Sequence, residues 1–256
     1  MSKSLGIITT AALVANCACA QVQHEESTAM LAPRKAVILD LHGVVLDKNF
    51  SFTKACTAAL RKKGWLRNMS REQVTELLKL LRHRVMNGPV SDDSLVAIAK
   101  KYDNEALAEL VVEIVNARGV NPVVVERIKT LQRMGFELII GSDIGQTAYE
   151  ALAQQEEFAA VKRCFSGVAG TTVSDAMQPT DTVMKSSATY FDRLLAANSL
   201  RKDVDLIVFV DDNAKIVAAA RDAGLKAIQF DNPDQLDTEL GEALGIVNQI
   251  ADAQTA

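Results

Sequence analysis

The sequence has few of the residues and patterns that identify several large functional classes. Among its 256 residues are three histidines, four cysteines and one tryptophan, and aromatic residues make up 5% of the chain. No His/Cys cluster has the spacing of a zinc site, so we expect no structural zinc. The net charge of −4 and the lack of a Lys/Arg block argue against nucleic acid as a partner. No apolar run reaches the roughly 18 to 20 residues of a membrane-spanning helix.

The rest of the composition is that of a globular protein, with 48% hydrophobic and 23% charged residues. The N-terminus differs from it. A positive charge precedes an apolar and small-residue run over 5–15, and Ala18-Cys19-Ala20 offers a cleavage pattern before the sequence turns polar. We therefore expect a signal peptide over 1–20, a linker over 21–34 and an exported protein, periplasmic or secreted. The alternatives are a disordered tail on a cytoplasmic protein and lipidation at Cys17.

Two cysteines, Cys56 and Cys164, remain if that segment is removed. They fall in different predicted lobes, and in an oxidising compartment they can form a single disulfide. The more usual outcome for such isolated cysteines is a pair of buried, inert thiols.

Apolar runs alternate with helical patterns through most of the chain. The runs at 36–39, 137–140 and 206–210 lack the polar alternation of a half-exposed strand, which is typical of strands covered on both faces. Repeated strand–helix units imply right-handed crossovers and a parallel sheet between two layers of helices. The segments expected to form strands are 35–41, 136–140, 163–165, 206–210 and 226–230.

Capping residues locate several helices. Ser51 precedes a helical pattern, Ser70 with Gln73 forms a capping box, and Asn121 followed by Pro122 is a typical helix start. The expected helices are 51–63, 70–86, one from Ser91, one ending by Gly119, 122–134, 145–154, 182–198, 213–223 and one after Pro233.

The fold class is therefore predicted to be α/β, a three-layer, doubly wound parallel sheet with an all-helical cap domain. The cap is expected over 48–118, and the α/β core over 35–47 and 119–250. Because the helical block follows the first strand, it would project over the carboxyl edge of the sheet. That edge is where open α/β folds bind their ligands.

Polar side chains are expected at this edge. Asp40 follows the first strand, Ser142 the second, and the pair Asp211-Asp212 the strand at 206–210, while Lys185 opens a predicted helix. Carboxylates, a hydroxyl and an ammonium at one sheet edge suit a divalent cation together with a phosphoryl group.

These residues resemble the motifs of the haloacid dehalogenase-like (HAD) hydrolase superfamily, in the same order along the chain. The resemblance covers about residues 35–235, and four motifs in order are far more specific than any one of them. The matching segments are Leu39-Asp40-Leu41-His42-Gly43-Val44-Val45, Ile140-Gly141-Ser142, Lys185-Ser186-Ser187-Ala188-Thr189-Tyr190-Phe191 and Phe209-Val210-Asp211-Asp212-Asn213.

The resemblance implies a Rossmann-like core and a hydrolase that cleaves a small phosphorylated substrate, a phosphomonoester, with Mg²⁺. Asp40 would attack phosphorus and form an aspartyl-phosphate. The ligands of Mg²⁺ would be Asp40, the backbone carbonyl of His42, and Asp211 or Asp212, of which Asp212 aligns better.

Two further residues carry over from the resemblance as catalytic. Ser142 and Lys185 would stabilise negative charge on the transferring phosphoryl group. The segment after Lys185 lacks the Pro-Asp-Pro that often follows this lysine in the family, so an ordinary solvated helix residue is the alternative there. The oligomeric state is left open by the sequence.

Position 42 departs from the family pattern. Phosphatases of the family carry a second Asp there, which protonates the leaving group and then activates water, whereas this chain has His42. His42 can replace that Asp, since imidazole has an unperturbed pKa of about 6.5. It can instead be a bystander in a slower hydrolase, or mark a site that only binds. Loss of such a group typically costs about 10² to 10⁴ in rate.

Two other functions therefore stay open beside phosphatase activity. One is a catalytically weak or inactive HAD-fold protein that binds a phosphorylated ligand or a partner protein. The other is a haloacid dehalogenase-type hydrolase, because a halide leaving group needs no proton. Dehalogenases of the superfamily work without metal and lack an acidic pair like Asp211-Asp212, so this pair favours phosphoryl chemistry. Ile216, where relatives often have Asn or Asp, slightly weakens that preference.

Overall fold

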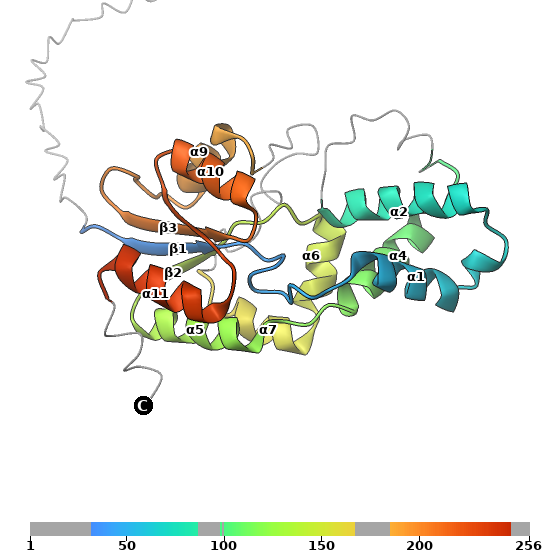
Figure 1. The fold of residues 1–256 in the computed structure, drawn as a ribbon, viewed down its shortest axis with the longest axis horizontal. Coiled ribbons are helices and arrows are strands. Elements are labelled where there is room, and N and C mark those ends of the chain that lie inside the picture. The colour runs from blue at the N-terminus through green and yellow to red at the C-terminus, as the bar shows by residue number, and fades with distance from the viewer. Residues whose placement is uncertain (1–31, 87–97, 99, 167–184, 247–256) are drawn as a thin grey trace, which may run out of the picture. The chain divides into compact units, whose positions relative to one another are not determined.

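A computed structural model describes residues 32–86, 98, 100–166 and 185–246 (Figure 1). Almost all of them belong to a compact unit over residues 33–256. The predicted signal peptide, Cys17, most of the linker, the helix from Ser91 and the segment 167–184 lie outside the described residues. Within these residues, no helix is long and apolar enough to cross a bilayer.

The described strands form one parallel sheet with the order β2-β1-β3-β4. Their bounds are Lys35–Leu39 for β1, Glu137–Ile140 for β2, Leu206–Asp211 for β3 and Lys226–Gln229 for β4. Leu39 pairs with Ile140 on one side and with Val210 on the other. The carboxyl ends of β1, β2 and β3 therefore meet at one edge. The next two strands in the chain, β2 and β3, lie on opposite sides of β1. The strand order therefore reverses at β1, and the expected ligand crevice of this topology lies between β1 and β3.

Helices cover both faces of the sheet, as the fold-class prediction requires (Figure 1). Val37 and Leu39 of β1 pack in one apolar cluster, and Ala36 and Ile38 pack in another. The first cluster also takes residues from α5 (Pro122–Arg133), α7 (Glu156–Lys162) and α11 (Pro233–Leu244), and the second from α9 (Ala188–Ala197) and α10 (Ala214–Asp222). The three-layer α/β prediction is confirmed.

The described part of 48–118 is helical and contains α1 (Phe52–Lys62), η1 (Trp65–Arg67), α2 (Arg71–Met86) and α4 (Asn104–Asn116). Helix α4 contacts α1 and α2, and also α6 (Gln146–Ala153), which follows β2. Buried side chains of these helices belong to the same apolar cluster as Val37 and Leu39. Whether 48–118 forms a separate cap domain stays a prediction.

Three predicted helix caps are present. The Ser51 side chain accepts a hydrogen bond from the backbone of Lys54. The Ser70 amide donates to Gln73 Oε1 at 2.7 Å and the Gln73 amide donates to Ser70 Oγ at 3.2 Å, which completes the capping box. The side chain of Asn121 caps α5, whose first residue is Pro122.

The strand predicted at 163–165 is wrong. Helix α7 occupies 156–162, and the next residues turn: the amides of Cys164 and Phe165 donate to the carbonyls of Val161 and Lys162 at 2.8 and 3.1 Å. The apolar signal came from Phe165, which is buried outside any strand.

The helix predicted at 182–198 begins later. Helix α9 starts at Ala188 because Ser187 has an extended backbone, with φ −105° and ψ 137°. Lys185 therefore lies in a turn before the helix and not on it.

The two cysteines in the described part of the chain, Cys56 and Cys164, are free thiols. Cys56 is buried in α1, and Cys164 is partly exposed. Burial raises the pKa of Cys56 to about 12, so its reactive thiolate form is suppressed.

Candidate active site

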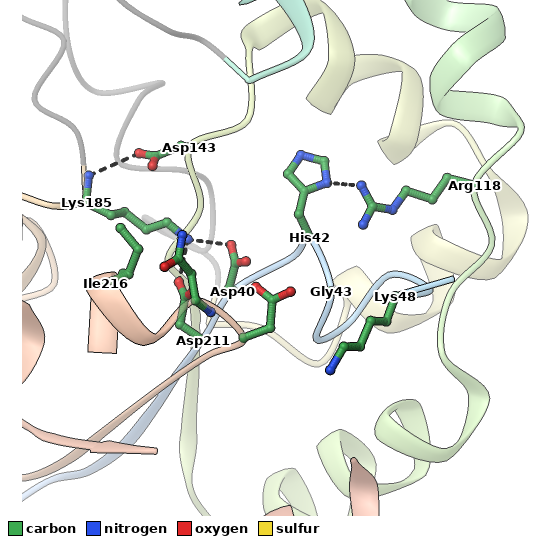
Figure 2. Close-up of a pocket in the computed structure, with 11 residues that line it drawn as sticks. Asp40, His42, Gly43, Lys48, Arg118, Asp143, Lys185, Asp211 and Ile216 are labelled. Carbon is green, nitrogen blue, oxygen red and sulfur yellow. Dashed lines mark hydrogen bonds and ion pairs between the residues drawn. The ribbon is translucent and has the colours of Figure 1, made fainter. Parts of the chain in front are cut away.

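The carboxyl ends of β1 and β3 bring two carboxylates to one ammonium. The Asp40 amide donates to the Val210 carbonyl at 2.9 Å, which ties the residue after β1 to β3. Lys185 Nζ donates to Asp40 Oδ1 and to Asp211 Oδ2, each at 2.7 Å (Figure 2). All three side chains are buried. The structure thus brings together Asp40 and Lys185, which are 145 positions apart, and adds Asp211 from the end of β3.

The turn before α9 directs Lys185 into this position. Its backbone amide donates to Asp143 Oδ1 at 3.3 Å, and its Nζ also lies 3.4 Å from the carbonyl oxygen of Gly141. Burial acts to lower the pKa of Lys185, but the Asp40 and Asp211 carboxylates outweigh it and raise the pKa above its ordinary value. Lys185 is therefore charged at neutral pH.

Three carboxylates could bind a cation together. Asp40, Asp211 and Asp212 each offer an oxygen, and these oxygens lie within 4.8 Å of one another. Burial, with the nearby Asp40, raises the pKa of Asp211 to about 6 and also raises the pKa of Asp212. Crowded carboxylate oxygens are the ligands that hard divalent cations prefer. The chemistry of this donor set therefore fits Mg²⁺.

Gly43 allows the close approach of Asp212. Its φ is +88°, in the left-handed region that favours glycine, and a Cβ atom there would lie 2.2 Å from Asp212 Oδ2. Any other residue at this position would be strained and would also displace the carboxylate. The predicted carbonyl ligand, that of His42, belongs to the residue just before this glycine.

The His42 imidazole is turned toward Arg118 (Figure 2). Its Nδ1 is hydrogen-bonded to Nη1 of Arg118, and because a guanidinium can only donate, Nδ1 must accept. Burial and then the charge of Arg118 lower the pKa of His42 to about 3. The ring is therefore neutral at physiological pH. Its Nε2 is buried and has no hydrogen-bond partner among the described residues.

Arg118 was not singled out from the sequence. It lies between α4 and α5, 76 residues from His42, and no local pattern connects the two. Its Nη2 lies 3.4 Å from the Asp47 carbonyl oxygen, and its Cζ lies 5.0 Å from the centre of the Phe50 ring. None of the ion pairs formed by the described residues includes Arg118.

A pocket of about 260 Å³ opens over these groups. Carboxylates and cations dominate its wall, and Ile216 adds an apolar side chain. Of its lining residues, Lys48 and Arg118 were not anticipated from the sequence. The lining residues are Asp40, His42, Gly43, Lys48, Arg118, Asp143, Lys185, Asp211, Asp212, Asn213 and Ile216.

Ser142 is the predicted site residue that does not line this pocket. Its side chain is fully buried, and its Oγ has no hydrogen-bond partner among the described residues. It does not cap the next helix either, because the N-cap of α6 is Gly145. The role of Ser142 stays a prediction.

Comparisons with known proteins cover most of the chain. Residues 34–224 match the model of a family described as haloacid dehalogenase-like hydrolase. No curated protein sequence matches the chain.

Among solved structures, a HAD family enzyme from Bacteroides thetaiotaomicron is similar at 13% identity and a TM-score of 0.52, over 78% of this chain and 94% of that one. A HAD phosphatase from Thermococcus onnurineus aligns at 16% identity and a TM-score of 0.50, over 77% and 86%. An L-2-haloacid dehalogenase from Xanthobacter autotrophicus aligns at 16% identity and a TM-score of 0.50, over 87% of each chain. At these identities the likeness concerns the fold.

Proposed function

Because the chain belongs to the haloacid dehalogenase-like hydrolase family, we propose that it is a magnesium-dependent phosphatase of a small phosphomonoester, with Asp40 as its nucleophile. The observation that carries the proposal is the cluster of Asp40, Asp211 and Asp212, with oxygens within 4.8 Å of one another beside the ammonium of Lys185. Phosphoryl transfer depends on a positioned nucleophile and on cationic charge around an anionic substrate. Asp40 is the positioned nucleophile, and Lys185 together with a cation held by the carboxylates would supply the positive charge.

The chain's own residues account for a two-step displacement. An Asp40 oxygen forms a bond to phosphorus while the bond to the ester oxygen breaks, and the leaving group departs as its oxyanion, which takes a proton from solvent. Water then attacks the phosphorus of the aspartyl-phosphate, which releases phosphate and restores the carboxylate. Lys185 orients Oδ1 of Asp40 at 2.7 Å and places its positive charge beside the transferring group.

Asp40, Asp211 and Asp212, with the carbonyl of His42, are the residues that would hold Mg²⁺. When bound, the cation supplies the charge that offsets repulsion between an anionic nucleophile and an anionic substrate. Burial and then the negative charge of Asp40 raise the pKa values of Asp211 and Asp212, and a bound cation would favour the charged form of both carboxylates.

We infer that His42 is a poor acid/base for the leaving group, because a neutral imidazole whose Nδ1 accepts from Arg118 has only its weakly acidic Nε2–H left. Its Nδ1 lone pair faces the guanidinium of Arg118, so the usual acceptor position of the ring is occupied. We therefore infer a hydrolase that acts without the acid/base of its relatives. Such an enzyme should favour esters with leaving groups that depart without protonation, and His42→Asp should increase the rate on alkyl phosphates.

Hydrolysis of p-nitrophenyl phosphate tests the proposal. We expect turnover with Mg²⁺, loss of turnover with EDTA, and loss in Asp40→Asn. The matched control is Asp203→Asn, an exposed carboxylate in a surface turn, which should keep the wild-type rate. Turnover that persists in Asp40→Asn would remove Asp40 from the mechanism. Mg²⁺ binding without turnover of any phosphate ester would instead favour a binding protein.

Cleavage of a carbon–halogen bond is the second candidate function. It is favoured by one observation, the orientation of His42, because a halide needs no proton to leave. Halide release from 2-chloropropionate that survives EDTA would support this activity over the phosphatase. No halide release, together with magnesium-dependent phosphate release, would exclude it.

Export is also a proposal. It is supported by the charge, apolar run and Ala18-Cys19-Ala20 pattern at the N-terminus. Mass spectrometry of the protein from its native cells should find an N-terminus at Gln21. An intact Met1, or a mature protein that begins at a lipidated Cys17, would contradict cleavage after Ala20.

A further inference from the structure

We propose that Arg118 and Lys48 form a second anion-binding subsite in the pocket. The substrate would then be a phosphomonoester whose leaving part carries its own anionic group, either a carboxylate or a second phosphate. This inference rests on the proposed phosphatase function, which assigns the phosphoryl group to the subsite at Asp40 and Lys185.

Three cationic side chains line the pocket, Lys48, Arg118 and Lys185. Lys185 is already engaged by two carboxylates at 2.7 Å each. The other two take part in none of the ion pairs that the described residues form; Lys48 Nζ reaches only the carbonyl oxygen of Asp231, at 3.4 Å. Two cations at a pocket without carboxylate partners are suited to an anionic ligand.

Arg118 is held in place by uncharged acceptors and forms no direct ion pair with a described carboxylate, although Asp40, Asp212 and Asp47 lie near enough to act on its charge. His42 Nδ1 takes a hydrogen bond from Nη1, the Asp47 carbonyl lies near Nη2, and the face of Phe50 packs against the guanidinium. Its Nε is buried and has no hydrogen-bond partner within the described residues. A buried donor without an acceptor is costly, and a guanidinium binds carboxylate or phosphate oxygens through paired N–H groups.

The Arg118 subsite is distinct from the nucleophile. The hydrogen bonds of Arg118 go to His42 and Asp47, and in the view of Figure 2 the His42 ring lies between Arg118 and Asp40. An anion on Arg118 is therefore a different group from the phosphoryl group at Asp40. A ligand with two carbon atoms between its anionic groups is small enough for the pocket of about 260 Å³.

Phosphoglycolate and ethyl phosphate form a suitable probe pair, because they have the same number of carbon atoms and differ in the carboxylate. Steady-state kinetics should give a kcat/KM for phosphoglycolate that falls about 10- to 100-fold in Arg118→Met, mainly through KM, while that for ethyl phosphate changes less than about threefold. Lys48→Met should lower kcat/KM for phosphoglycolate by less, about three- to tenfold, because Lys48 is exposed. A higher kcat/KM for ethane-1,2-diol bisphosphate than for phosphoglycolate would show that the subsite prefers a second phosphate to a carboxylate.

The matched control is Arg193→Met, an exposed arginine on α9, which should leave both substrates unchanged. Arg118→Lys retains the charge without the paired donors, so its kcat/KM for phosphoglycolate should lie between those of the wild type and Arg118→Met. This variant also guards against a folding defect in Arg118→Met. Equal losses on both substrates in Arg118→Met would overturn the proposal, because Arg118 would then act on the transferring phosphoryl group itself.

Binding separates this inference from the proposed function. Asp40→Asn does not need to turn over its ligand, so calorimetry can compare the two probes directly in the presence of Mg²⁺. Tighter binding of phosphoglycolate, lost when Arg118→Met is added, would support the subsite even if the wild-type protein hydrolysed no ester. Equal affinities for the two probes would overturn it even if p-nitrophenyl phosphate were hydrolysed.

Discussion

Replacement of Gly43 by alanine tests how the loop after β1 supports the proposed metal site. In Gly43→Ala the new Cβ would meet Asp212 Oδ2 at 2.2 Å and its Cγ at 2.6 Å, far inside contact distance. The Asp212 carboxylate must move, because the three atoms nearest to the new Cβ all belong to it. We therefore expect two separate effects, a loss of folding stability and a loss of Mg²⁺ affinity.

The magnitudes follow from the geometry. A residue with a Cβ at φ +88° costs about 1–2 kcal/mol of stability. Displacement of one of the proposed carboxylate ligands should weaken Mg²⁺ binding by about 10- to 100-fold. Gly135→Ala is the matched control, since Gly135 has φ +80° and an added Cβ would have nothing within 4 Å. This control should show the stability loss alone.

Urea unfolding and isothermal titration with Mg²⁺ measure the two effects separately. Gly43→Ala and Gly135→Ala should lose similar free energies of unfolding, and only Gly43→Ala should lose Mg²⁺ affinity and p-nitrophenyl phosphate turnover. Wild-type Mg²⁺ affinity in Gly43→Ala would refute the reasoning, because Asp212 could then not be a ligand in the position that the structure gives it.

Three further predictions concern stability, each measured by urea unfolding. Lys185→Met should lower the free energy of unfolding by about 3–5 kcal/mol without metal, because it leaves buried carboxylates uncompensated. Mg²⁺ should restore part of that free energy. The control Lys62→Met, whose side chain is 74% exposed, should lower it by under about 1 kcal/mol. His42 has a depressed pKa, so its contribution is present above pH 6.5 and is lost as the pH falls toward 3; between pH 6.5 and about 4.5, wild-type stability relative to His42→Gln should fall by up to about 3 kcal/mol. A constant difference would contradict the neutral imidazole. Asn121→Ala should cost about 1 kcal/mol through the lost cap of α5, and an unchanged midpoint would show the cap to be dispensable.

The parts of the fold that could be predicted are those with local signals. The apolar runs at β1, β2 and β3 need no partner to be recognised, and parallel pairing then forces Asp40 and Asp211 to the same edge. Helix caps such as Ser70 with Gln73 act within one turn. The parallel sheet and the three layers followed from these signals.

The parts that could not be predicted depend on packing between distant segments. The short segment that ends at Phe165 resembles a strand in the sequence. In the structure Phe165 is instead buried just after helix α7. The contact between Arg118 and His42 joins positions 76 residues apart. The full burial of Ser142, away from the pocket lining, likewise depends on how the loop after β2 packs.

Chemical trapping of the aspartyl-phosphate tests the central proposal most directly. Protein quenched during turnover of p-nitrophenyl phosphate with Mg²⁺ is treated with borohydride, which reduces an acyl-phosphate to the alcohol, and is then sequenced by mass spectrometry. We predict homoserine at position 40 in the wild-type protein and none in Asp40→Asn. Sustained turnover with an unmodified Asp40, or with a phosphorylated residue elsewhere, would contradict the account.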